Sequence, residues 1–184
     1  MNPIDAARRL ATVFDGDGLP YGLGGALALG VWGAPRATKG VDVSVFVETD
    51  QLGRVLDSLE RAGALVNRED AVRSVDRIGL FQARLGRIVI DVFMSDHPHA
   101  AQMAARVCLV AEPDGARLAF ISAEDLCLHK LMFGRAKDVV DLERLFAVRV
   151  LDLAYVRTWL TQMVPAQDRR LAILDDLERR FGAP

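Results

Sequence analysis

The pattern of apolar residues predicts an α+β fold, with a mixed β-sheet flanked by helices and a helical C-terminal part. Two observations support this prediction. Up to residue 121, segments with strand-like alternation are interspersed with segments whose apolar residues recur at helical spacing. From Ser122 onward the pattern is helical only, with breaks at Gly134 and Pro165.

The N-terminal segments alternate helix with strand. Apolar residues at helical spacing predict a helix over residues 3–14, which a glycine-rich turn ends. A strand over residues 21–23 then leads through Gly24 and Gly25 into a helix over residues 26–32, which consists of good helix formers.

The middle of the chain supplies the rest of the sheet. Residues 41–47 alternate valines with other residues, which is typical of a half-buried strand. A single apolar stripe predicts a helix over residues 50–62. Strands over residues 80–85 and 87–94 meet at Gly86, which indicates a hairpin.

The remaining elements are mostly helices. A helix that runs to about residue 107 is expected to have Ser95 or Asp96 as its cap and Pro98 in its first turn. A short strand is expected over residues 117–121. The later helices are expected over residues 123–133, 136–147, 152–163 and 167–181. We assign residues 1–121 to a core and residues 122–184 to a helical part that completes the same domain.

Composition narrows the class of protein. The 184 residues are 51% hydrophobic, which is enough to bury a sizeable core. No apolar run could cross a bilayer and the N-terminus does not resemble a signal peptide, so we expect a cytoplasmic protein with no membrane partner. A net charge of -2 argues against a general polyanion binder. Cys108 and Cys127 lack metal-ligand spacing and are expected to be reduced core residues.

Two carboxylates interrupt apolar strands. Asp42 lies in the valine-rich segment over residues 41–47, and Asp91 lies within an apolar run over residues 88–93. A carboxylate in such a place is costly unless a metal ion or a hydrogen-bond donor satisfies it. Two of them on neighbouring strands would form a divalent-cation site, while a strand-end carboxylate that reaches solvent or an arginine is the simpler alternative for Asp91.

The helical part carries a cluster of charges. Lys130 is the basic side chain of an otherwise apolar helix that Ser122 can cap. Asp138 and Asp141 share one helix face, where Lys137 can reach Asp141. Taken alone, these residues indicate a solvated, salt-bridged helix face.

Two other polar clusters have structural interpretations. Asp15 and Asp17 alternate with glycines between a helix and a strand, which is typical of a turn. His97 and His99 stand at a capped helix start without further metal ligands close by.

The motifs in their order resemble a known family. The stretch YGLGGALALGVWGAPRATKGVDVSVF over residues 21–46 resembles the first motif of the AbiE-type (AbiEii/AbiGii) abortive-infection toxin family, where a glycine pair and a helix lead to an Arg-x-Thr-x-Asp-x-Asp strand. Asp91 matches the later acidic strand motif, EDLCLHK over residues 124–130 resembles the third motif, and RAKDVVDL over residues 135–142 resembles the fourth. The resemblance covers residues 20–145 and implies a nucleotidyltransferase fold.

The resemblance also implies an activity and a site. Such a protein would transfer a nucleoside monophosphate from an NTP to a hydroxyl acceptor on RNA, protein or a small molecule, and would serve as the toxin of a bacterial toxin–antitoxin pair, with a cognate antitoxin as partner. Asp42 and Asp91 would bind Mg²⁺ (or Mn²⁺), with Asp91 as ligand or general base. Nucleotide-binding roles would fall to Gly24, Gly25, Arg36, Thr38, Lys130, Arg135, Lys137, Asp138 and Asp141.

The chain departs from the family at one position. Gly40 stands where the family has the first aspartate of its carboxylate pair, and strand alternation places it on the same face as Asp42. Loss of that ligand weakens a two-metal site, for which the neutral Ser44 is a poor substitute. An alternative function is therefore a catalytically weakened member that binds a nucleotide or a partner. A purely structural domain would require the four ordered motif matches to be accidental.

Overall fold

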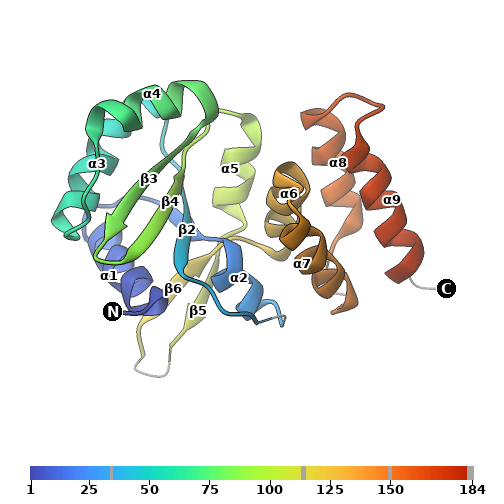
Figure 1. The fold of residues 1–184 in the computed structure, drawn as a ribbon, viewed down its shortest axis with the longest axis horizontal. Helices are drawn as coiled ribbons and strands as arrows, with labels where there is room; N and C mark the ends of the chain where they lie inside the picture. Colours follow the sequence, from blue (N-terminus) through green and yellow to red (C-terminus); the bar gives the residue numbers. More distant parts are fainter. Residues whose placement is uncertain (34, 113–114, 149–150, 182–184) are drawn as a thin grey trace. The chain divides into compact units, whose positions relative to one another are not determined.

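The computed structural model describes residues 1–33, 35–112, 115–148 and 151–181. They form two compact units, which we call the sheet unit (Met1–Leu27 and Ala37–Ile121) and the helical unit (Ala28–Arg36 and Ser122–Pro184) (Figure 1). Residues 149–150 and 182–184 of the predicted C-terminal part lie outside the described residues. That the two units complete one domain stays a prediction.

The sheet unit contains a mixed sheet. Its described strands are ordered β3-β4-β2-β1-β6-β5, with β2 parallel to β4, β1 parallel to β6, and the other neighbours antiparallel. The predicted α+β class is thereby confirmed. In chain order the strands are β1 (Tyr21–Leu23), β2 (Gly40–Val45), β3 (Leu80–Leu85), β4 (Ile88–Phe93), β5 (Cys108–Ala111) and β6 (Arg117–Phe120).

Helices surround this sheet. The packing of α1 against β2, β6 and α3 buries one apolar side of the unit. No helix in the described part of the chain is long and apolar enough to span a membrane. The helices of the sheet unit are α1 (Pro3–Gly16), the start of α2 (Gly25–Val31), the 3₁₀ turn η1 (Thr49–Gln51), α3 (Leu52–Arg61), α4 (Arg68–Ile78) and α5 (Pro98–Ala105).

Three features of this unit differ from the sequence prediction. The sequence did not predict α4, whose buried side chains are Ala71 and Val75, because so short an apolar stripe gives a weak periodic signal. It also did not predict the four-residue edge strand β5. The cap of α5 is His97, whereas Asp96 binds the backbone N–H and hydroxyl of Thr49 instead.

The helical unit follows the predicted pattern. Its helices are α6 (Ala123–Phe133), α7 (Ala136–Ala147), α8 (Leu153–Met163) and α9 (Arg169–Phe181), together with the end of α2. The Ser122 hydroxyl accepts a hydrogen bond from the Asp125 N–H and caps α6, as the sequence predicted. Most of α6 is buried, including polar residues, which places charged side chains inside the unit.

The start of α2 packs closely against β2. The Gly24 N–H donates to the Asp42 carbonyl at 2.8 Å, and Gly25 has a φ of 54°. A Cβ added at Gly25 would lie 1.9 Å from Asp42 Oδ2, whereas a Cβ at Gly24 would lie 3.4 Å or more from its neighbours. Gly25 is therefore the glycine that this approach requires.

Gly25→Ala should destabilise the protein by about 2–4 kcal/mol, because a side chain must adopt positive φ and displace the Asp42 carboxylate. Gly24→Ala is the matched control and should cost less than about 1 kcal/mol, since its methyl group makes ordinary contacts. Urea unfolding of both variants measures the difference. Equal losses would show that the close approach at Gly25 is not present.

Candidate functional site

The strand pairing brings the two predicted strand carboxylates together. Asp42 on β2 and Asp91 on β4 are direct partners in a parallel register, so their side chains leave the same face of the sheet. Neighbouring strands lie about 4.8 Å apart. Both side chains are half-buried, whereas Val41 and Val43, which alternate with Asp42, are buried on the opposite face. The carboxylates thus share the polar face of the sheet.

Gln82 extends this pair into a row of three. It is the register partner of Asp91 on β3, and its Nε2 donates to Asp91 Oδ1 at 2.7 Å. Gln82 is not among the site residues that the sequence predicted. The register of the predicted hairpin could have identified this residue, because a two-residue turn at Gly86 and Arg87 places Gln82 opposite Asp91.

A side chain at position 40 would approach the neighbouring strand closely. A Cβ added at Gly40 would lie 2.9 Å from the carbonyl oxygen of Val89 on β4, so the backbone of the neighbouring strand occupies the space that a side chain needs. An aspartate at position 40 would therefore require the Val89 carbonyl to shift. Thr38 is tied to the same residue, since its hydroxyl donates to the Gly40 carbonyl at 3.1 Å.

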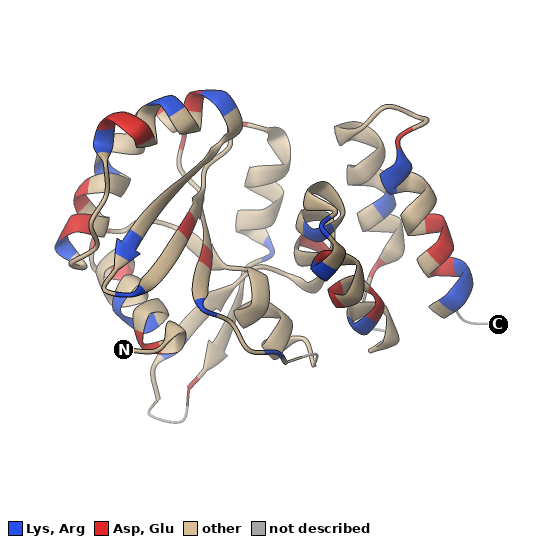
Figure 2. Cartoon of the chain, viewed as in Figure 1, with Lys and Arg blue, Asp and Glu red and all other residues tan. Residues whose placement is uncertain are grey.

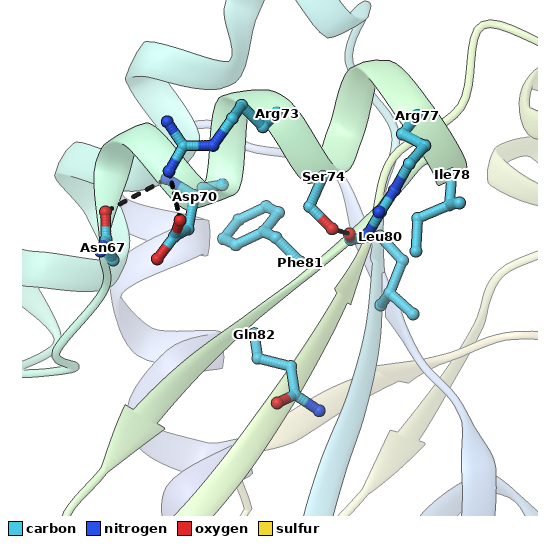
Figure 3. Close-up of a pocket in the computed structure, with 10 residues that line it drawn as sticks. Asn67, Asp70, Arg73, Ser74, Arg77, Ile78, Leu80, Phe81 and Gln82 are labelled. Carbon is cyan, nitrogen blue, oxygen red and sulfur yellow. Dashed lines mark hydrogen bonds and ion pairs between the residues drawn. The ribbon is translucent and has the colours of Figure 1, made fainter.

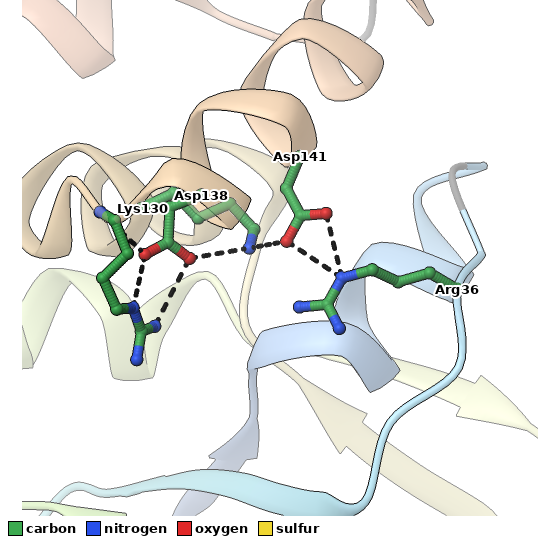
Figure 4. Close-up of polar contacts among 5 residues, drawn as sticks. Arg36, Lys130, Asp138 and Asp141 are labelled. Carbon is green, nitrogen blue, oxygen red and sulfur yellow. Dashed lines mark hydrogen bonds and ion pairs between the residues drawn. The ribbon is translucent and has the colours of Figure 1, made fainter.

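The helical unit holds a buried ion-pair network (Figure 4). Lys130 Nζ lies 2.5 Å from Asp141 Oδ2 and 3.6 Å from Asp138 Oδ1. Arg36 Nε donates to both Asp141 oxygens, at 2.9 and 3.0 Å, and Arg135 Nε donates to Asp138 Oδ2 at 2.6 Å. Charges therefore alternate from Arg36 to Arg135.

This network is not a solvated helix face. Asp138 and Asp141 are each 1% exposed and Lys130 is 4% exposed, so the interpretation from the residues alone is wrong. Burial acts to raise the pKa of Asp141, but the hydrogen bonds from Arg36 and Lys130 outweigh it and hold this pKa below its ordinary value. Lys137 is exposed, and Asp141 pairs with Arg36 and Lys130 instead.

The predicted site residues thus form two clusters. Asp42 and Asp91 lie together in the sheet unit, near Gly24, Gly25 and Thr38. The basic residues and aspartates of the ion-pair network belong to the helical unit. That both clusters serve one site stays a prediction.

The carboxylates of the sheet unit fit one metal ion better than two. Among the described residues, no group of three or more His, Cys, Asp or Glu is arranged to hold a metal ion. Mg²⁺ is often held by one or two carboxylates, with water and substrate phosphates as the other ligands, and Asp42 with Asp91 meets that requirement. A pair of closely spaced dications needs more negative charge than these two carboxylates supply.

Other polar groups prove structural. The carboxylate of Asp17, after α1, accepts from the Ser58 hydroxyl at 2.5 Å and pairs with Arg61. The Nδ1 atom of His97 accepts the backbone N–H of His99, as in a helix cap. Burial raises the pKa of the Cys127 thiol, so a core role fits this residue.

The sheet unit also contains a cavity of about 830 Å³ between α4 and β3 (Figure 3). Arg73 and Arg77 line it from α4, and Arg73 pairs with Asp70. Its β3 wall ends at Gln82, the residue that binds Asp91. Figure 2 shows basic and acidic residues interspersed along helices α3, α4 and α9.

Asp141→Ala should destabilise the protein by about 3–5 kcal/mol, because it leaves the buried Lys130 ammonium with one distant partner. Asp175→Ala removes a carboxylate that is 53% exposed and pairs with Arg157, and should cost less than about 1 kcal/mol. Urea unfolding at pH 7 compares the two.

The contribution of Asp141 to the free energy of unfolding should depend on pH. Because the folded state lowers this pKa, the contribution is complete above the unfolded value of about 3.9 and is lost as pH falls through the folded value. The stability difference between the parent and Asp141→Asn should therefore shrink in acid. A difference that grows as pH falls would contradict the lowered pKa.

Gly40→Ala and Gly40→Asp should each destabilise the protein by about 1–3 kcal/mol, because the new Cβ displaces the Val89 carbonyl. Gly53→Ala is the control, since that exposed helical glycine has open space around its added Cβ and should gain stability. Thermal unfolding separates them. A Gly40→Asp variant as stable as the parent would instead indicate that position 40 can accept the aspartate that the family has there.

Comparison with known proteins supports the fold. No protein-family model matches the chain, and no curated protein matches it. Two solved structures of the antibiotic-resistance factor ANT(2'')-Ia are similar. Its solution structure has a TM-score of 0.58 at 14% identity over 87% of this chain and 94% of that chain. Its crystal structure with adenylyl-2''-tobramycin has a TM-score of 0.55 at 13% identity, over 95% and 96%.

A lincomycin-bound structure of the lincosamide antibiotic adenylyltransferase LnuA has a TM-score of 0.49 at 13% identity, over 80% of this chain and 98% of that chain. At these identities a likeness establishes the fold and not the activity. Membership of the AbiE-type family stays a prediction. The chain has the nucleotidyltransferase fold.

Proposed function

We propose that the chain binds an NTP with Mg²⁺ or Mn²⁺ and transfers its nucleoside monophosphate to a hydroxyl acceptor. The observation that carries this proposal is the parallel register of Asp42 with Asp91 in a sheet of the nucleotidyltransferase fold. Paired carboxylates on one face supply anionic oxygen ligands that hold Mg²⁺ against a triphosphate.

The reaction is a displacement at phosphorus. The acceptor oxygen forms a bond to the α-phosphorus, the bond from that phosphorus to the β-phosphate bridge breaks, and pyrophosphate leaves. The hydroxyl proton passes to Asp91 or to water. Asp42 and Asp91 would hold the cation, which when bound neutralises phosphate charge.

The helical unit supplies candidate phosphate-binding groups. Arg36 and Arg135 end the ion-pair network, and their side chains are 26% and 50% exposed. A guanidinium matches phosphate oxygens in two-pronged hydrogen bonds. Asp138 and Asp141 would hold these arginines in place, and Lys130 would contact the triphosphate only in competition with its two carboxylate partners.

A small molecule is among the acceptors to test. The crystal structure of similar fold holds adenylyl-2''-tobramycin, in which an adenylyl group is joined to a small hydroxyl-bearing molecule. The net charge of -2 also favours a small acceptor over a long polyanion. Hydroxyls of RNA and of protein are the other acceptors to test. The proposed role as a toxin would be supported by a neighbouring gene that encodes a small helix-turn-helix regulator.

A second candidate function is nucleotide or partner binding without turnover. Gly40 favours it, because a Cβ at position 40 would meet the Val89 carbonyl oxygen at 2.9 Å and the remaining carboxylate pair fits one metal ion. The two candidates differ in one measurable respect, which is whether label from the NTP becomes covalently attached to an acceptor.

The test incubates the protein with each α-labelled NTP, Mg²⁺ or Mn²⁺, and pools of RNA, protein and aminoglycoside or lincosamide acceptors. The parent should transfer label, and Asp42→Asn and Asp91→Asn should each reduce transfer by about 100-fold or more, because each removes a charged cation ligand. Asp50→Asn, at an exposed position, is the control.

Binding is followed in parallel by thermal shift with NTP and Mg²⁺. Nucleotide-dependent stabilisation of the parent without transfer would select the second candidate. Neither stabilisation nor transfer with any NTP would rule out both nucleotide transfer and nucleotide binding.

A further inference from the structure

Asp42 and Asp91 are held by different means. The Asp42 carboxylate lies against Gly25, and its own backbone carbonyl accepts the Gly24 N–H. The hydrogen bond that the structure gives Asp91 comes from Gln82 on the edge strand β3. Because an ionised carboxylate only accepts hydrogen bonds, the amide nitrogen of Gln82 is the atom that faces it.

We infer that Gln82 is a positioning residue that orients Asp91 toward the bound cation, an inference that rests on the proposed function. Its N–H holds Asp91 Oδ1, which leaves Oδ2 as the oxygen for the metal ion. Ligating carboxylates are commonly oriented in this way by a neighbouring donor, and removal of the donor weakens metal binding.

The fold does not require this amide. Gln82 is exposed, while Phe81 and Ala83, its neighbours on β3, are buried on the other face. The pairing of β3 with β4 depends on backbone hydrogen bonds, which any residue except proline can make at position 82. An exposed polar side chain on an edge strand therefore contributes little to stability, so its contact with Asp91 can be removed without unfolding the sheet.

Gln82 lies between the cavity and the carboxylate of Asp91. Its side chain lines the cavity between α4 and β3 (Figure 3). The same side chain donates to Asp91. In a site with only two carboxylates, the orientation of each one matters more than in a site with three, because fewer ligands fix the cation.

The test measures Mn²⁺ affinity by calorimetry in the full chain. Gln82→Met keeps the length of the side chain and removes the donor, and it should weaken Mn²⁺ binding by about 10- to 100-fold while the melting temperature is unchanged. Gln102→Met, at an exposed position on α5, is the matched control and should bind as the parent does.

A double-mutant cycle separates positioning from a general effect. In the Asp91→Asn chain, Gln82→Met should change the residual Mn²⁺ affinity by less than about twofold, because the residue acts through Asp91. Equal losses in both backgrounds, or parent affinity in the single variant, would overturn the positioning role. A parent that binds no Mn²⁺ at millimolar concentration would overturn the proposed metal site and this role with it.

Discussion

Strand β2 pairs in parallel with β4, and this pairing brings Asp42 and Asp91 onto one face. The valines of β2 fix the register, because a slip of one residue would turn them outward and bury Asp42. Two like charges on adjacent strands repel, so the arrangement is more favourable with a cation or donor nearby than without one. Gln82 enters the row through the same register, one strand farther out.

In the helical unit, charged side chains are buried as ion pairs. Lys130 and two aspartates are almost fully buried, and each has a partner of opposite sign. Buried ion pairs offset their desolvation cost only in part, so such a network is weak evidence for stability. The physical effect of the network is to hold two arginine side chains in position. Arg36, in the loop after α2, and Arg135, the N-cap residue of α7, are held at its two partly exposed ends.

Two glycines of the sheet unit are close to different groups: one to a carboxylate and the other to a backbone carbonyl. Gly25 leaves room for a carboxylate, since Asp42 lies where its side chain would be. Gly40 leaves room for a backbone carbonyl, that of Val89. An aspartate at position 40 would therefore require the Val89 carbonyl of β4 to shift. A site of two carboxylates and one cation is consistent with this geometry, and the orientation of Asp91 by Gln82 then gains importance.

The sequence by itself determined most helices and strands, the glycine turn at Gly24 and Gly25, and the two strand carboxylates, because local periodicity and turn chemistry carry that information. It missed α4, which has too few apolar residues to show a period. Only the tertiary structure decided that Asp42 lies opposite Asp91, that Val89 occupies the space beside Gly40, and that Asp141 is buried between Arg36 and Lys130. Such facts depend on contacts between segments distant in the chain, which strand pairing and helix packing set and local spacing does not encode.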